Sequence, residues 1–178
     1  MKTMVAVSLL VLASPALAEE AQRGGFTLGL SLGAGAASFG NGGGTEAALG
    51  GMNLFIGGFV TPRWAIAAKF SGVNYGPFDS RLKDDFGANI AGVLGPVAQF
   101  WVNDRLSVNA GFGLGVMKLK TLDGIESNQS GFGLMAGVMV LPLVLAHHGL
   151  GLYFDVAPIF ASDQNVVTYQ GGLAWQWY

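Results

Sequence analysis

Lys69 and Asp155 each stand alone as a charge within a long uncharged stretch of this 178-residue chain. Such a cation and anion could line a path for ions or solutes, or fill an interior together with neutral polar side chains. An unpaired interior charge is costly unless water reaches it. We therefore expect both residues to join a polar network on an inward-facing surface, either by pairing directly or through separate contacts. The other candidate members of this lumen network are Asn53, Asn89, Gln99, Asn109 and Tyr153.

His147 and His148 are the two histidines of the chain, and they are adjacent in a predicted turn. Neighbouring turn residues point in different directions, and a Ser–His triad or a zinc site needs further partners nearby. No such set is evident at that position. The glycine-rich segments lack the spacing of a dinucleotide loop, and residues 123–126 lack that of a calcium loop. The sequence predicts no catalytic residue, no metal and no cofactor.

The segment from Leu106 to Val116 indicates which elements position these groups. Its even positions are all apolar, and its odd positions are Ser, Asn or Gly. This alternation is typical of a β-strand with one wide apolar face and one small or polar face. A soluble barrel would place the bulky residues inside, whereas a membrane barrel turns them toward lipid. We therefore predict a membrane strand whose polar face lines an interior.

The same alternation recurs along the chain and predicts an all-β fold, an up-and-down antiparallel transmembrane β-barrel of about eight strands. Lys69 and Asp155 fall on inward faces. A spanning helix over residues 131–146 is the competing interpretation, but Pro142, repeated Gly and the two-residue period argue against it. The predicted strands cover about 25–37, 48–60, 64–75, 88–102, 106–116, 131–141, 149–160 and 166–178.

The predicted connections are of two kinds. Tight turns are expected at 61–63, 103–105 and 146–148, and mostly longer, polar or Gly-rich loops at 39–46, 76–86, 120–130 and 162–165. Outer-membrane barrels turn short connections toward the periplasm and longer ones outward. With eight strands, both ends of the barrel domain would be periplasmic.

Prolines and aromatic residues add two further expectations. Each strand proline removes a ladder hydrogen bond, so we expect bulges or early strand ends at Pro96, Pro142 and Pro158, with one strand ending before Leu143. Aromatic residues predict two girdles, one at each membrane boundary. The periplasmic set is Phe26, Phe59, Trp64, Phe100, Trp101, Trp177 and Tyr178; the outer set is Phe39, Tyr75, Phe78, Phe86, Phe132, Phe160 and Tyr169.

Residues 1–18 have the pattern of a cleaved export signal. Lys2 precedes a short apolar core, and an A-x-A site ends at Ala18 before Glu19. We expect residues 19–178 to form one outer-membrane barrel domain, without cysteine. Charged residues make up 11% of the chain, far below the roughly 25% of soluble domains. The net charge of −2 suggests no nucleic-acid partner.

The signal pattern, the strand–turn pattern, the segment Val102–Val108 and the aromatic C-terminus resemble the small eight-stranded outer-membrane β-barrel family of Gram-negative bacteria. The resemblance implies a place in the outer membrane, contact with its lipid and lipopolysaccharide, and recognition of the C-terminal strand by the barrel-assembly machinery. Family members end in an aromatic residue preceded by apolar residues at alternate positions. Tyr178 is the terminal aromatic here, but Trp177, Trp175 and Leu173 are out of phase with it by one.

Two functions fit this fold: a structural or surface-interaction role without catalysis and, as the alternative, a small-solute channel or transporter through the barrel lumen or wall. Eight strands leave an interior that side chains can just fill, which favours the first. Inward Gly residues and Met117, Met135 and Met139 leave some space, which keeps the second open. The charged loops 76–86 and 120–130 are candidate sites for a surface ligand. An outer-membrane enzyme is the least favoured hypothesis, because the outer end has serine residues but no histidine to complete a Ser–His site.

Overall fold

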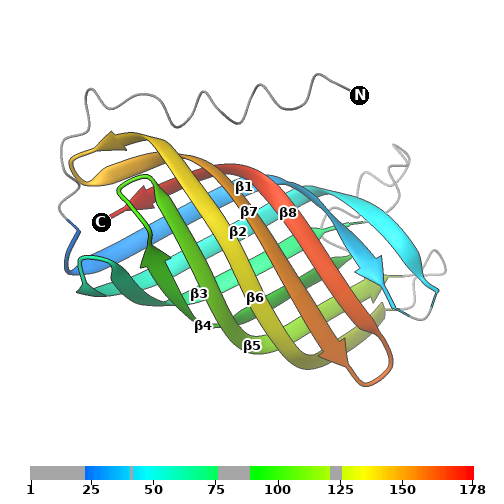
Figure 1. Cartoon of the computed structure of the whole chain (residues 1–178). Coiled ribbons are helices and arrows are strands. Elements are labelled where there is room, and N and C mark those ends of the chain that lie inside the picture. Colours follow the sequence, from blue (N-terminus) through cyan, green and yellow to red (C-terminus); the bar gives the residue numbers. More distant parts are fainter. Residues whose placement is uncertain (1–22, 41, 76–88, 121–125) are drawn as a thin grey trace.

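The computed structural model describes residues 23–40, 42–75, 89–120 and 126–178. Its strands form one closed antiparallel barrel in which each strand pairs with its sequence neighbours and the first pairs with the last (Figure 1). This confirms the predicted fold class. The described residues contain no helix that is both long and apolar enough to cross a bilayer. The strands are β1 (Phe26–Phe39), β2 (Gly44–Thr61), β3 (Trp64–Asn74), β4 (Ile90–Trp101), β5 (Leu106–Lys120), β6 (Glu126–Leu145), β7 (His148–Ala161) and β8 (Asn165–Trp177).

The apolar face of each strand is on the outside of the barrel, as the alternation predicts. Leu114 in β5 is 53% exposed, and its cross-strand neighbours Leu94 and Phe132 are exposed beside it. Inward positions of the same strands carry buried polar residues such as Gln99 and Ser107. A bulky apolar outer face around a polar interior is the arrangement that lipid requires.

Two predicted loops are shorter than expected because the ladder continues beyond the apolar part of the strands. The β1–β2 connection comprises residues 40–43, and β5 pairs with β6 as far as Lys120 and Glu126. Residues 127–130 of β6 are polar on both faces, so hydrophobic alternation carries no signal there although backbone pairing persists. The β7–β8 connection, residues 162–164, is as short as the turns at the opposite end.

Pro142 does not end its strand, which corrects the prediction. The β6–β7 register shifts between Val140 and Leu143, and β6 then continues to Leu145. Leu141 keeps the inward phase of Met135 and Met139 and is fully buried, whereas Pro142 and Leu143 are both exposed, so that after the bulge Val144 points inward. A bulge absorbs the missing donor without stopping the strand. Pro96 and Pro158 cause no register shift; each loses pairing on one side of its strand and keeps it on the other.

We call the end that carries Arg23, Tyr178 and the turns at 62–63, 102–105 and 146–147 the terminal end of the barrel, and the opposite end the loop end. An apolar cluster of Trp101, Leu141, Val144 and Tyr178 fills the interior at the terminal end. A larger cluster occupies much of the remaining interior toward the loop end. It includes Val73, Tyr75, Val93, Met117, Ile159 and Val166.

These clusters correct part of the predicted aromatic girdles. Trp101 and Tyr178 lie inside the barrel, as does Tyr75. Partly buried Phe39 and Phe59 pack against the interior clusters, because their positions fall on the inward phase of their strands. Phe78 and Phe86 lie outside the described residues. The remaining girdle residues face outward; Phe26 packs against Trp177 in a tilted arrangement, with ring centroids 5.6 Å apart, and Trp64 packs likewise against Phe100, at 4.8 Å.

Candidate functional site: the polar interior of the barrel

Lys69 and Asp155 form an ion pair across the lumen. They project inward from β3 and β7, and the Lys69 Nζ lies 2.8 Å from the Asp155 Oδ1. The two residues are 4% and 3% exposed. Each charge therefore has its counter-charge within hydrogen-bond distance, which offsets much of the cost of removing both from water.

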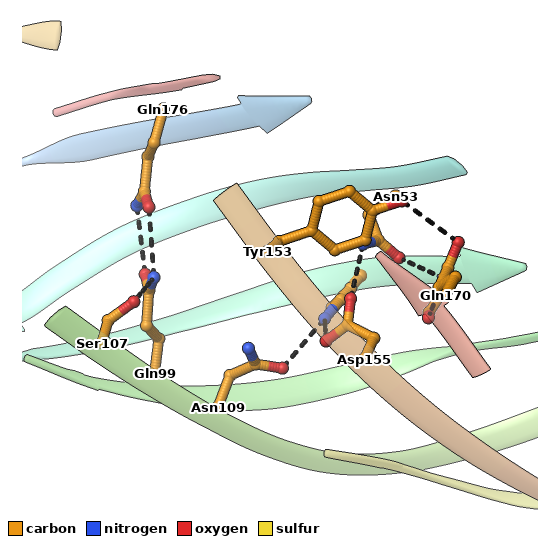
Figure 2. A network of polar contacts seen from close by, with 10 residues as sticks. Asn53, Gln99, Ser107, Asn109, Tyr153, Asp155, Gln170 and Gln176 are labelled. Atoms are coloured by element: carbon orange, nitrogen blue, oxygen red, sulfur yellow. Dashed lines mark hydrogen bonds and ion pairs between the residues drawn. The ribbon is translucent and has the colours of Figure 1, made fainter. Parts of the chain in front are cut away.

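A group of neutral polar side chains surrounds this pair (Figure 2). The Lys69 Nζ also donates to the Asn109 Oδ1 at 2.9 Å, and the Asn53 Nδ2 donates to the other carboxylate oxygen of Asp155. The Gln170 Nε2 donates to the Asn53 Oδ1 at 2.8 Å. We call this the ion-pair group; it is completed by Ser71, which accepts from Gln170, and by Tyr153, whose hydroxyl donates to the Gln170 Oε1.

A second polar group lies closer to the terminal end. Gln99 and Gln176 face each other in a reciprocal amide pair, with N–O distances of 3.1 and 3.0 Å (Figure 2). The Gln99 Nε2 also donates to the Ser107 Oγ, and the Gln176 Nε2 donates to the Thr27 Oγ1. We call these four residues the amide group. Together the two groups cross the lumen with side chains from β1, β2, β3, β4, β5, β7 and β8.

Most of the residues predicted for one network are distributed between these two groups. Asn53, Lys69, Asn109, Tyr153 and Asp155 are in the ion-pair group, and Gln99 is in the amide group. Asn89 is not among the residues named in either group; it precedes β4 at the loop end, where its carbonyl accepts a hydrogen bond from the Tyr75 N–H. The sequence prediction did not include Gln170 and Gln176. Both occupy inward positions of β8, but their partners on β2 and β4 depend on how the closed barrel staggers its strands.

A cavity of about 40 Å³ lies among the two groups, lined in part by Ser31, Asn109 and Met139. A cavity needs roughly 10–15 Å³ to admit one water molecule, so this one is large enough to hold water. Glycine residues on the inner face of the barrel leave space for these polar side chains. A Cβ at Gly137 would collide with the Asp155 carboxylate, and one at Gly51 would lie 2.9 Å from the Gln170 Oε1.

The two histidines have structural contacts at the terminal end. The His147 Nδ1 lies 3.2 Å from the backbone oxygen of Tyr178, and the His148 ring stacks on Trp175 with centroids 5.8 Å apart. Within the described ranges, no group of three or more His, Cys, Asp or Glu residues is placed to hold a metal ion. The predicted cleavage site, Ala18 and Glu19, lies outside the described residues.

Comparison with known proteins agrees with this architecture. The family model of the outer membrane protein beta-barrel domain matches residues 4–141. Neisserial surface protein A has a similar solved structure, with a TM-score of 0.63, 14% sequence identity, and coverage of 85% of this chain and 96% of that chain. No curated protein sequence gives a significant match.

Ail, the attachment invasion locus protein of Yersinia pestis, is also similar. Its structure matches with a TM-score of 0.57 and 16% identity over 87% of this chain and 99% of that one. Its complex with the heparin analogue sucrose octasulfate matches at 0.55 and 15% over the same shares. At these identities the likeness shows the fold, and the family match adds the membership. The chain therefore belongs to the outer membrane protein β-barrel domain family and is an outer-membrane protein of Gram-negative type.

Proposed function

We propose that this protein is a closed barrel with a structural or surface-interaction role, and that it neither conducts solutes nor catalyses a reaction. One observation carries the proposal: side chains fill the lumen. The ion-pair group and the amide group cross it, and apolar clusters occupy the interior beside them. A passing solute would have to separate Lys69 from Asp155, and a separated buried charge is strongly unfavourable.

In the proposed orientation, the barrel spans the outer membrane with its loop end facing outside. We place the terminal end in the periplasm. The candidate segments for a surface ligand are 76–86 and 120–130; residues 76–86 and 121–125 lie outside the described residues, and residues 126–130 belong to β6. Neisserial surface protein A and Ail are named for surface and attachment roles, which supports an interaction role here. The outward apolar face would contact outer-membrane lipid, and lipopolysaccharide would surround the loop end.

The C-terminal strand is the proposed contact for the barrel-assembly machinery. Leu173, Trp175 and Trp177 are on its outward face, whereas Tyr178 is buried in the terminal cluster. The alternating apolar series therefore ends at Trp177, one residue before the C-terminal position of the sequence. We propose that Trp177 is the aromatic residue presented during assembly.

Conductance in a planar lipid bilayer tests the closed lumen. The wild-type protein is expected to insert without stable current steps, because the two polar groups and the apolar clusters obstruct the lumen. Steady, large conductance would contradict the proposal and favour the alternative of a small-solute channel. Insertion is checked independently on a gel, where the folded protein of an unboiled sample migrates differently from the unfolded protein of a boiled one.

A further inference from the structure

Arg23 folds back onto the terminal end of the barrel and is nearly enclosed there. Its guanidinium carbon lies 3.9 Å from the centroid of the Trp101 ring and 5.3 Å from that of Tyr178. Its Nη1 lies 3.1 Å from the Asp104 Oδ1, and its Nη2 donates to the Asp104 carbonyl at 2.7 Å. Only 5% of the Arg23 side chain is exposed.

These contacts have the composition of a binding site for a planar cation. Aromatic faces attract a cation through the ring quadrupole, and a guanidinium can stack on the ring while its edges donate hydrogen bonds. Trp101 and Tyr178 supply the faces, and Asp104 supplies a carboxylate and a carbonyl. Trp101 and Tyr178 also belong to the apolar cluster that fills the terminal end, so the cation covers that cluster.

We propose that Trp101, Tyr178 and Asp104 form a guanidinium site at the mouth of the barrel, and that Arg23 occupies it as a latch that seals the lumen from the periplasm. The inference rests on the closed lumen proposed above. It adds a binding site for a guanidinium group, and it identifies Arg23 as the residue that can leave this site.

The chain around Arg23 allows such movement. Gly24 and Gly25 connect Arg23 to β1; Gly25 has a φ of +68°, and a Cβ at either position would meet open space. The Phe59 N–H binds the Gly25 carbonyl at 2.8 Å, which anchors the base of the arm. The docked state is also imperfect, because the Arg23 Nε and the Trp101 Nε1 are buried without a hydrogen-bond partner among the described residues. Unpaired buried donors reduce the stability of the docked state.

Thiol accessibility behind the latch tests the proposal. The chain has no cysteine, so Met139→Cys introduces a single reporter that lines the cavity and packs against the terminal cluster. In the folded protein in lipid vesicles, labelling by a water-soluble methanethiosulfonate reagent is expected to be slow. Adding Arg23→Ala should speed labelling by at least about tenfold, equivalent to about 1.4 kcal/mol of lost docking free energy. Asp104→Asn, which keeps the backbone contact, should give a smaller increase.

Two controls separate a latch from a general loss of stability. Arg63→Ala removes an exposed arginine from the turn between β2 and β3 at the same end and should leave the labelling rate unchanged. Millimolar guanidinium chloride should slow labelling of the Arg23→Ala protein, whereas sodium chloride of equal ionic strength should not. If the Arg23→Ala protein fails to fold, Arg23→Gln, which keeps much of the side-chain length without the cation, provides the same comparison.

The outcomes distinguish the latch from the closed lumen. Fast labelling of the Met139→Cys parent would show that the lumen is open, and the proposed function would fail. Slow labelling in both the parent and the Arg23→Ala protein would overturn the latch alone. Faster labelling that guanidinium does not reverse would overturn the guanidinium site.

Discussion

Asp155→Ala is expected to destabilise the folded barrel by about 3–5 kcal/mol, the range for removing one partner of a buried ion pair. The carboxylate accepts hydrogen bonds from both Lys69 and Asn53. Its removal leaves the Lys69 ammonium in the lumen with the Asn109 Oδ1 as its remaining hydrogen-bond acceptor among the described contacts. The free energy of unfolding is measured by urea titration in lipid vesicles, with folded and unfolded protein separated on a gel.

The matched double variant Lys69→Met/Asp155→Met is expected to be clearly less damaging than Asp155→Ala. It removes both charges together and fills much of their volume with apolar side chains, so no buried charge is left alone. Asp163→Ala, which removes an exposed carboxylate from the β7–β8 connection, should change stability by less than about 0.5 kcal/mol. A double variant as unstable as the single one would refute the coupling between Lys69 and Asp155.

Leu114→Arg is expected to cost about 2–4 kcal/mol, the range for a cation on the lipid face near the bilayer midplane. Leu114 points outward near the middle of β5, between the apolar residues Leu94 and Phe132 of the adjacent strands. No counter-charge lies among these paired neighbours. The folded fraction after refolding into vesicles, measured over a urea series, reports the loss.

Asn109→Ala in the same strand is the control for Leu114→Arg. Asn109 faces the lumen and accepts one hydrogen bond from Lys69, which keeps its ion pair with Asp155. The loss should therefore be smaller than that of Leu114→Arg. If Asn109→Ala proved the more damaging change, the assignment of the two faces of β5 would be wrong.

The facing of the strands could be predicted because lipid imposes a pattern with a period of two. In β5, every even residue from Leu106 to Val116 is apolar, and the structure turns this series outward. The same pattern does not predict two parts of β6. Residues 127–130 extend β6 with polar side chains on both faces, and the bulge at Pro142 reverses the phase so that Leu143 faces outward and Val144 points inward.

The lumen contacts could be predicted only in part. The inward positions of Lys69 and Asp155 follow from alternation, but their pairing depends on which strands face each other across the closed barrel. Gln170 and Gln176 have partners on β2 and β4 that are 117 and 77 residues away in sequence. Alternation could not place Arg23, because it precedes β1 and its partners Trp101 and Asp104 lie far away in sequence, at the end of β4 and in the β4–β5 connection.

Heat-modifiability of the protein extracted from isolated outer membranes tests the central claim most directly. A closed barrel stays folded in detergent without boiling, because its backbone hydrogen bonds are satisfied within the closed sheet. We predict that the protein is found in the outer-membrane fraction and that unboiled and boiled samples migrate at different positions on a gel. Recovery in the soluble periplasmic fraction, or identical migration before and after boiling, would contradict a closed membrane barrel.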